Sequence, residues 1–257
     1  MSLRTVSATR YVTPLREGGS LPAIVEADDD GMYVLKFRGA GQGVKALIAE
    51  VIAGGIARAL QLPLPEMVLI ALDVELARTE PDPEIQDLIR ASAGLNFALD
   101  YLPGAITFDP VADRPSAQLA SRIVWFDAFI SNVDRTPRNA NLLMWHGGLK
   151  LIDHGASLYF HHGWDGSSAA ADRPFDRIRD HVLLPWADAI EAADAESSRR
   201  LDRAVLDAIV AQVPDDWLQG PDAFGDPATQ REAYVDYLAK RLRSPRRFVE
   251  EVGRARA

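Results

Sequence analysis

The segment from Gln42 to Leu60 most constrains the fold of this chain, because its pattern is helical and almost no side of the helix is polar. Large apolar residues recur along it at steps of three and four, which is the spacing of one helix face. The opposite face carries the small residues Ala46, Ala49, Ala53, Gly54 and Ala57. A helix that is apolar or small all round is usually buried on more than one side. The sequence therefore predicts a helix enclosed between other parts of the fold.

The elements around this helix differ in kind. Before it, residues 10–37 indicate short strands separated by turns, ending in the strand Met32–Phe37. After it, Met67–Leu72 and Asn96–Leu102 are predicted strands, and the acidic, proline-bearing stretch Thr79–Gln86 is predicted to be a loop. The first hundred residues or so are thus expected to be rich in strands and to carry a single helix.

The rest of the chain is mainly helical in pattern. Around His146-Gly147-Gly148 two short apolar runs predict a hairpin. The predicted helices are 116–131, 176–193, 196–213 and 228–252. With a boundary at Pro103-Gly104, the sequence predicts an α+β fold in two lobes, an N-lobe of residues 1–102 and a C-lobe of residues 103–257.

Charge and composition exclude several classes of function. Acidic residues number 37 and basic residues 28, and the net charge of -9 argues against direct nucleic-acid binding, which usually needs a basic face. The chain has no cysteine, which excludes disulfides and thiolate metal ligands. It has neither an apolar run long enough to span a membrane nor the apolar core of a signal peptide, so we expect a cytoplasmic protein with no membrane partner.

Basic residues gather between Lys240 and Arg256 near the C-terminal end. The simpler interpretation is a solvated helix face, and the alternative is a docking surface for an acidic partner.

The polar loop, residues 132–139, carries the pattern that most directly indicates chemistry. Asp134 is followed five residues later by Asn139, and the predicted hairpin then leads directly into Asp153. Hard divalent cations such as Mg²⁺ prefer oxygen ligands of this kind. Phosphoryl transfer needs that metal and one carboxylate that orients the attacking hydroxyl. Asp and Asn in turns often serve the turn alone, but the spacing that joins these residues favours a site.

Lys36 and Glu50 form a second candidate pair. Lys36 alternates with apolar residues along its strand, and Glu50 is the lone acid on the small-residue face of the helix. A charge on a packed face is costly unless it is paired, so Lys36 is the expected partner of Glu50. A lysine on an exposed sheet edge and a glutamate on a solvated face remain the alternatives. Adjacent His161 and His162 lack a third metal ligand at helical spacing and are interpreted as loop residues.

Four stretches together resemble HipA-like kinases. They are Tyr33–Phe37; Ala49-Glu50 with Ile56–Pro63; Phe126–Arg135 with Asn139; and Leu151–Gly155. A similar polar loop also occurs in phosphatidylinositol kinases, so the wider kinase-like superfamily is implied as well. The resemblance implies a two-lobed protein-kinase-like fold that binds ATP and Mg²⁺ between its lobes.

The resemblance also implies roles for the candidate residues. Asp134 would be the catalytic base, and Asn139 and Asp153 would hold the magnesium ion. Lys36 would pair with the ATP phosphates, and Glu50 would orient Lys36.

Two further segments complete the expected nucleotide site. The turn Gly18-Gly19-Ser20 lies between predicted strands and would cover the phosphates, although a plain hairpin turn is the alternative. The segment Asp100-Tyr101-Leu102 ends the last strand of the N-lobe and would offer backbone groups to adenine.

The sequence also departs from the family pattern. HipA toxins are longer and carry an extra N-terminal subdomain, and Thr136 stands where their polar loop commonly has histidine. The leading hypothesis is a kinase that transfers the γ-phosphate of ATP to a Ser or Thr hydroxyl of a protein. The alternatives are a kinase of the same fold acting on a small-molecule hydroxyl, and a non-catalytic nucleotide-binding interaction module.

Overall fold

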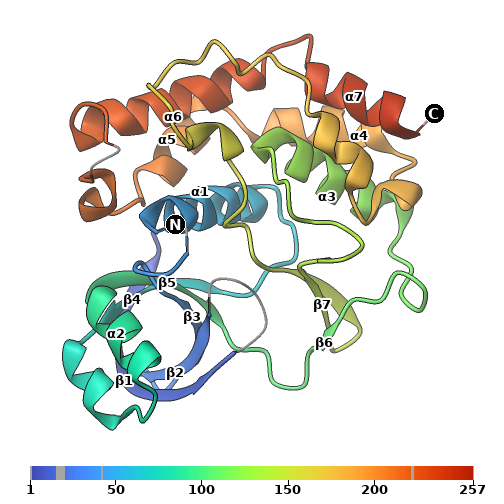
Figure 1. The fold of residues 1–257 in the computed structure, drawn as a ribbon. Coiled ribbons are helices and arrows are strands. Elements are labelled where there is room, and N and C mark those ends of the chain that lie inside the picture. Colours follow the sequence, from blue (N-terminus) through green and yellow to red (C-terminus); the bar gives the residue numbers. More distant parts are fainter. Residues whose placement is uncertain (1, 16–20, 42, 221–222, 257) are drawn as a thin grey trace.

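A closed five-stranded barrel forms the N-terminal part of the protein. The computed structural model describes residues 2–15, 21–41, 43–220 and 223–256. The barrel strands are β1 (Arg4–Pro14), β2 (Ala23–Ala27), β3 (Met32–Lys36), β4 (Met67–Leu72) and β5 (Gly94–Asp100). They follow the order β1-β2-β3-β5-β4, and β1 closes the ring by pairing antiparallel with β2 and parallel with β4 (Figure 1).

Helix α1 (Val44–Ala59) lies between the barrel and the helical part of the protein (Figure 1). Each residue from Leu47 to Ala57 is buried, as the sequence predicted for a helix without a polar face. Two adjacent glycines show how tightly it is enclosed. A Cβ on Gly54 would lie 2.1 Å from the sulfur of Met67 in β4, and a Cβ on Gly55 would lie 2.6 Å from the side chain of Ile209 in α5 (Arg203–Val210). The helix therefore has no room for larger residues at either position.

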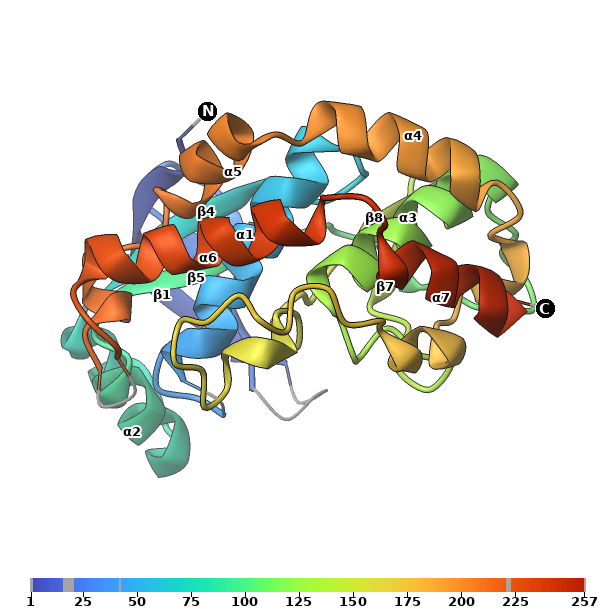
Figure 2. The ribbon, with the colours of Figure 1, turned by 90° about the horizontal axis from the view of Figure 1, so that it is seen from above.

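The C-terminal part is built around one small sheet and a group of helices. The sheet contains β6 (Ile106–Thr107), β7 (Leu142–Trp145) and β8 (Gly148–Leu151), and the last two form the predicted hairpin. The helices are α3 (Ala117–Ile130), α4 (Ile190–Arg200), α5 (Arg203–Val210), α6 (Pro227–Arg241) and α7 (Arg247–Arg256). Seen from above, α6 runs over α1, and α7 lies beside α3 (Figure 2). This mixed architecture, with a strand-rich N-terminal part and a mainly helical C-terminal part, confirms the predicted α+β class.

The structure differs from the sequence-based expectation in several segments. The helix expected at 196–213 is divided between α4 and α5, which end and begin on either side of Leu201 and Asp202. The N-terminal part carries a second helix besides α1.

The stretch expected as a loop at 79–86 contains the end of a 3₁₀ helix (Val74–Thr79) and the start of α2 (Pro83–Ala91). Asp82 caps α2 by accepting a hydrogen bond from the backbone N–H of Glu84, and proline is well tolerated in a first turn.

The helix expected at 176–193 is also absent as a continuous element. Short 3₁₀ helices at Asp176–Asp180 and Leu184–Trp186 take its place, and α4 begins only at Ile190. Pro185 cannot donate a backbone hydrogen bond and so does not continue an α-helix.

The basic C-terminal stretch is not one solvated face. Arg241 is buried in α6 and donates hydrogen bonds to the carbonyl oxygens of four residues, Ala128, Phe129, Ala171 and Arg173. Arg246 forms a bidentate pair with Asp194, at 2.7 Å for each contact. These two arginines join helices and are part of the packing. Within the described residues, none of the helices has both the length and the apolar surface to cross a bilayer.

Candidate active site

Lys36 reaches the site from β3. The strand alternates as expected, with Tyr33 and Leu35 buried and Lys36 half-buried on the other face. Its Nζ contacts Oε1 of Glu50 and lies 2.6 Å from Oδ1 of Asp153. One ammonium group thus joins the barrel, helix α1 and the segment after β8.

Glu50 is fully buried at this junction. Its Oε1 contacts Lys36, and its Oε2 lies 3.6 Å from Nδ1 of His154. Burial is the largest single effect and would raise the pKa of Glu50, but the charge of Lys36 and the contacts with Lys36 and His154 together lower the pKa below the ordinary value. Burial would likewise lower the pKa of Lys36, and the two carboxylates raise it instead. Both groups are therefore charged at neutral pH.

Asp153 follows β8 by two residues and is more exposed than its partner, with 40% of its side chain accessible. Its backbone has a φ of 54°, in the left-handed region that few residues other than glycine adopt. Gly155 lies beside the ion pairs, and a Cβ there would be in ordinary van der Waals contact with Oε1 of Glu50, at 3.4 Å. Backbone strain of this kind tends to concentrate at functional sites.

Asp134 lies in the polar loop and is held by side-chain amides. Its Oδ2 accepts hydrogen bonds from Nδ2 of Asn139 at 2.8 Å and from Nδ2 of Asn141 at 3.2 Å. The backbone N–H of Asp134 donates to Oδ1 of Asn132 at 3.1 Å. The structure therefore brings Asp134 and Asn139 together and adds Asn132 and Asn141, which the sequence reasoning did not single out.

A buried network fixes the base of the polar loop. Asp127, on α3, accepts from Nε of Arg135 at 2.6 Å and from Nδ2 of Asn132 at 2.8 Å, and it lies 2.9 Å from Nε2 of His181. Burial would raise the pKa of Asp127, but the charge of Arg135 and the contact with His181 lower it. Burial lowers the pKa of His181 despite that carboxylate. The sequence analysis missed this network.

Arg135 also connects the polar loop to the segment that carries Asp153. One of its terminal nitrogens donates to the carbonyl oxygen of Asn141 and lies 3.4 Å from that of Ile152. The backbone N–H of Ile152 donates in turn to the carbonyl of Asn141 at 3.1 Å. The positions of Asp134 and Asp153 are thus linked through a single guanidinium group.

The structure describes one of the two segments that were expected to contact the nucleotide. Gly18, Gly19 and Ser20 lie outside the described residues. At the end of β5, the backbone N–H of Asp100 donates to the carbonyl oxygen of Glu66 at 2.8 Å. The backbone N–H of Tyr101 donates to the carbonyl oxygen of Met32 at 2.9 Å. The amide of Leu102 has no hydrogen-bond acceptor among the residues that the structure describes. Burial, followed by the charge of Glu66, raises the pKa of Asp100.

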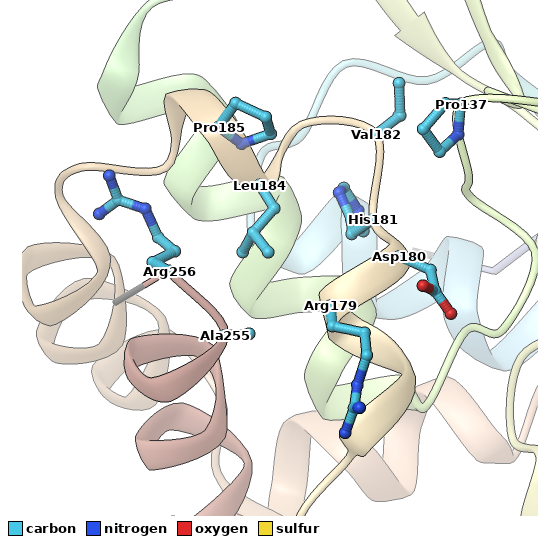
Figure 3. A pocket seen from close by; sticks show the side chains of 9 residues that line it. All are labelled: Pro137, Arg179, Asp180, His181, Val182, Leu184, Pro185, Ala255 and Arg256. Atoms are coloured by element: carbon cyan, nitrogen blue, oxygen red, sulfur yellow. The ribbon is translucent and has the colours of Figure 1, made fainter.

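A surface cavity of about 480 Å³ lies beside the polar loop (Figure 3). Pro137 contributes to it from that loop, and Ala255 and Arg256 contribute from the end of α7. The remaining lining residues are Arg179, Asp180, His181, Val182, Leu184 and Pro185. Its lining is mixed, with apolar side chains such as Leu184 between residues that carry charge.

Within the described ranges, no group of three or more His, Cys, Asp or Glu residues suited to a metal ion occurs, either at this site or elsewhere. His161 was expected in a loop, but it ends the short 3₁₀ helix Tyr159–His161, is buried, and has its Nδ1 3.0 Å from the hydroxyl oxygen of Tyr234.

Comparisons with known proteins agree with this geometry. The HipA-like kinase family matches residues 9–248, whereas a comparison with curated proteins found no match. A solved structure of the Helicobacter pylori proinflammatory kinase CtkA is similar, with a TM-score of 0.56 and 11% identity over 97% of this chain and 98% of that chain. The Golgi casein kinase with Mn/ADP bound is similar at a TM-score of 0.51 and 11% identity, over 99% of this chain and 74% of that chain.

At these identities the structural likeness shows the fold, which is that of kinases. The family match spans nearly the whole chain and includes the strand of Lys36, helix α1, the polar loop and Asp153. The chain therefore belongs to the HipA-like kinase family and is a phosphotransferase.

Proposed function

We propose that this kinase binds ATP with Mg²⁺ and transfers the γ-phosphate to a Ser or Thr hydroxyl of a protein. The observation that carries the proposal is the contact of Lys36 with both Glu50 and Asp153. Three elements distant in sequence meet there at a charged, partly exposed point. Such an arrangement suits a lysine that pairs with phosphate groups and a buried glutamate that orients it.

The residues present fit a magnesium ion. Asp153 offers a half-exposed carboxylate, and Asn139 offers an amide oxygen because its Nδ2 already donates to Asp134. Hard cations prefer such oxygen donors, and the similar Golgi casein kinase was crystallised with manganese and ADP. We therefore assign Asn139 and Asp153 as the metal ligands. The ion, when bound, would neutralise charge on the phosphates, and Lys36 would turn from Asp153 toward them.

Asp134 is the proposed catalytic base. Asn139 and Asn141 hold its Oδ2, which limits the rotation of the carboxylate and leaves Oδ1 to accept the proton of an acceptor hydroxyl. The hydroxyl oxygen would form a bond to the γ-phosphorus as the bond to the β,γ-bridging oxygen breaks. The proton would pass to Asp134, and ADP would leave.

Adenine would lie at the connection after β5, where we propose that the N-lobe (1–102) meets the C-lobe (103–257). The amides of Asp100 and Tyr101 are already engaged, so the amide of Leu102 is the proposed donor to the base. That the turn Gly18-Gly19-Ser20 covers the phosphates of ATP remains a prediction from the sequence.

A protein acceptor is favoured by the surface cavity beside Pro137, which lies three residues after Asp134 in the polar loop. A site that admits a polypeptide must be open near the base, whereas a metabolite kinase needs an enclosed pocket. A small-molecule acceptor is the second candidate, and a non-catalytic nucleotide-binding module is the third.

The test compares wild type with Asp134→Asn, using radiolabelled ATP with Mg²⁺ and measuring both autophosphorylation and ADP release. We expect turnover to fall by about a hundredfold or more, with nucleotide binding and melting temperature retained. Asp109→Asn is the matched control, because Asp109 is an exposed turn residue that accepts a backbone hydrogen bond from Val111. Phosphopeptide mapping of the labelled wild-type protein identifies the residue type modified.

Full turnover in Asp134→Asn would show that Asp134 is not the base. Labelling of metabolite hydroxyls without any labelled Ser or Thr would replace the protein acceptor by a small molecule. A wild-type protein that binds ATP but turns over none would support the binding-module alternative.

A further inference from the structure

His154, in the segment after β8, is buried beside the active site, and only 1% of the residue is exposed. Its ring packs edge-to-face on Phe126 of α3, with 5.7 Å between the ring centroids. The backbone around it is fixed as well. The N–H of Ser157 donates to the carbonyl oxygen of His154 at 2.9 Å, and the N–H of Leu158 donates to that of Ile130 at 2.7 Å. His154 is therefore held by the C-terminal part of the protein.

The ring of His154 faces Glu50, which belongs to helix α1. Its Nδ1 lies 3.6 Å from Oε2 of Glu50, slightly farther than a hydrogen bond allows. This oxygen is buried and has no hydrogen-bond partner among the residues that the structure describes, whereas Oε1 of the same carboxylate contacts Lys36. One half of the Glu50 carboxylate is thus satisfied, and the other half has only the histidine ring opposite it.

The carboxylate determines which ring nitrogen of His154 carries the proton. A carboxylate oxygen only accepts hydrogen bonds, and an unprotonated Nδ1 would also only accept, so their lone pairs would repel each other. The proton therefore belongs on Nδ1, where the N–H is directed at Oε2 of Glu50. Nε2 is buried without a hydrogen-bond partner in the described ranges, and this tautomer leaves it a lone pair and not an unpaired N–H.

The open hydrogen bond matters once Lys36 contacts phosphate. In the proposed reaction Lys36 turns from Asp153 toward the phosphates, and the carboxylate of Glu50 must hold it there. A carboxylate that is bonded at one oxygen only is free to rotate, and a buried oxygen without a donor is costly. Both problems are removed if His154 donates to Oε2. Catalytic hydrogen bonds are often long before the substrate binds and shorten in the complex.

We propose that His154 is a positioning residue, which donates from Nδ1 to Oε2 of Glu50 in the nucleotide complex and thereby keeps Oε1 directed at Lys36. Because the next residue before it is Asp153, the same contact joins α1 to the segment of the proposed metal ligand. This inference rests on the proposed contact of Lys36 with phosphate. His154 itself contacts neither nucleotide nor acceptor in this role.

The test compares two ligands by calorimetry at neutral pH with the full chain. AMP-PNP with Mg²⁺ is a non-hydrolysable analogue of the nucleotide, and adenosine shares its base and ribose but has no phosphate. The variants are His154→Asn, whose amide nitrogen lies near the place of Nδ1, and His154→Gln, whose amide nitrogen lies near that of Nε2. The affinity ratio of the two ligands reports the phosphate contact, whereas general damage to the fold weakens both.

We expect His154→Gln to bind AMP-PNP about tenfold more weakly and adenosine as wild type does, because a hydrogen bond to a charged group is lost. His154→Asn retains a donor at the right place and should keep the affinity for AMP-PNP within about twofold of wild type. His161→Phe is the matched control. His161 is equally buried and also has an unpartnered Nε2 among the described residues, so its replacement should leave the affinity ratio unchanged.

Nitrogen NMR of the imidazole in the nucleotide-free wild type gives a second measurement that needs no variant. We expect the Nδ1–H tautomer for His154. The role of His154 is overturned by the Nε2–H tautomer, by wild-type affinity for AMP-PNP in His154→Gln, or by an equal loss for adenosine. Equal affinity of the wild type for the two ligands would instead overturn the phosphate contact of Lys36, and with it both this inference and the proposed function.

Discussion

Arg135 and Asp127 form an ion pair with both side chains fully excluded from solvent and 2.6 Å between Nε and Oδ2. Arg135 belongs to the polar loop and follows Asp134 in the sequence, whereas Asp127 lies on α3. Burying two charges is costly, and the pair is tolerated because Asn132, His181 and the carbonyl of Asn141 satisfy the remaining donors and acceptors. The base of the polar loop is therefore held by electrostatics within the core.

We predict that Asp127→Asn lowers the free energy of unfolding by about 3–5 kcal/mol, because it leaves the guanidinium of Arg135 buried without a counter-charge. Urea unfolding measures the change. Asp87→Asn is the matched control, since it breaks the exposed pair of Asp87 with Arg90 and should cost about 1 kcal/mol or less. Equal losses in the two variants would contradict the importance of burial here.

A second prediction separates stability from nucleotide binding at Lys36. Lys36→Met leaves the buried carboxylate of Glu50 without this counter-charge and should lower the free energy of unfolding by about 3–5 kcal/mol. The double variant Lys36→Met/Glu50→Leu replaces the pair by apolar groups and should recover most of that stability. Nucleotide affinity, followed by calorimetry with Mg-ATP, should stay low in both variants. Recovery of nucleotide binding in the double variant would argue against a phosphate contact by Lys36.

The third prediction concerns pH and follows from His161. Its pKa is about 3 in the folded protein and has an ordinary value of 6.5, so the unfolded chain binds one proton more in that interval. The free energy of unfolding should therefore fall as the pH drops below about 6.5, by up to about 1.4 kcal/mol per pH unit from this residue. Urea unfolding near neutral pH and at about pH 5.5 should show a smaller difference in His161→Phe than in wild type. The same difference in both proteins would contradict the assignment of this pH dependence to His161.

The fourth prediction tests Arg241 as a connector of helices. Its guanidinium donates to four backbone carbonyls at 2.8 to 2.9 Å, and an ammonium group has only three donors and a different geometry. Arg241→Lys should lower the free energy of unfolding by about 2 kcal/mol. Arg243→Lys, at an exposed position two residues further along, should change it by less than about 0.5 kcal/mol. Comparable values for the two variants would show that the buried hydrogen bonds contribute little.

The sequence was most informative where a local pattern would cost free energy without a specific partner or a specific residue. An alternating strand and a lone acid on an otherwise apolar helix were enough to predict the contact of Lys36 with Glu50. The hairpin at 142–151 was predictable for a similar reason, because its turn needs residues such as Gly147, whose φ is 73°.

The network below the polar loop was not predicted, because its members are far apart in the chain. Asp127 and His181 are 54 residues apart, and no local pattern indicates that they meet. One signal was present: Asp127 is an acid within an apolar helix, and the argument applied to Glu50 calls for a partner there too. The start of α2 was also readable from Asp82-Pro83, but the acidic composition of that stretch favoured a loop.

The parallel pairing of β1 with β4 has a consequence for how the protein is made and handled. Arg4 pairs with Val68, so the ring can close only after β1 has found a partner strand 64 residues later in the chain. Until then, β1 and the unpaired side of the growing sheet are open to other chains. A shortened protein that begins after Pro14 would expose the edges of both β2 and β4 permanently. Such a fragment should self-associate during expression even though it retains the proposed catalytic residues.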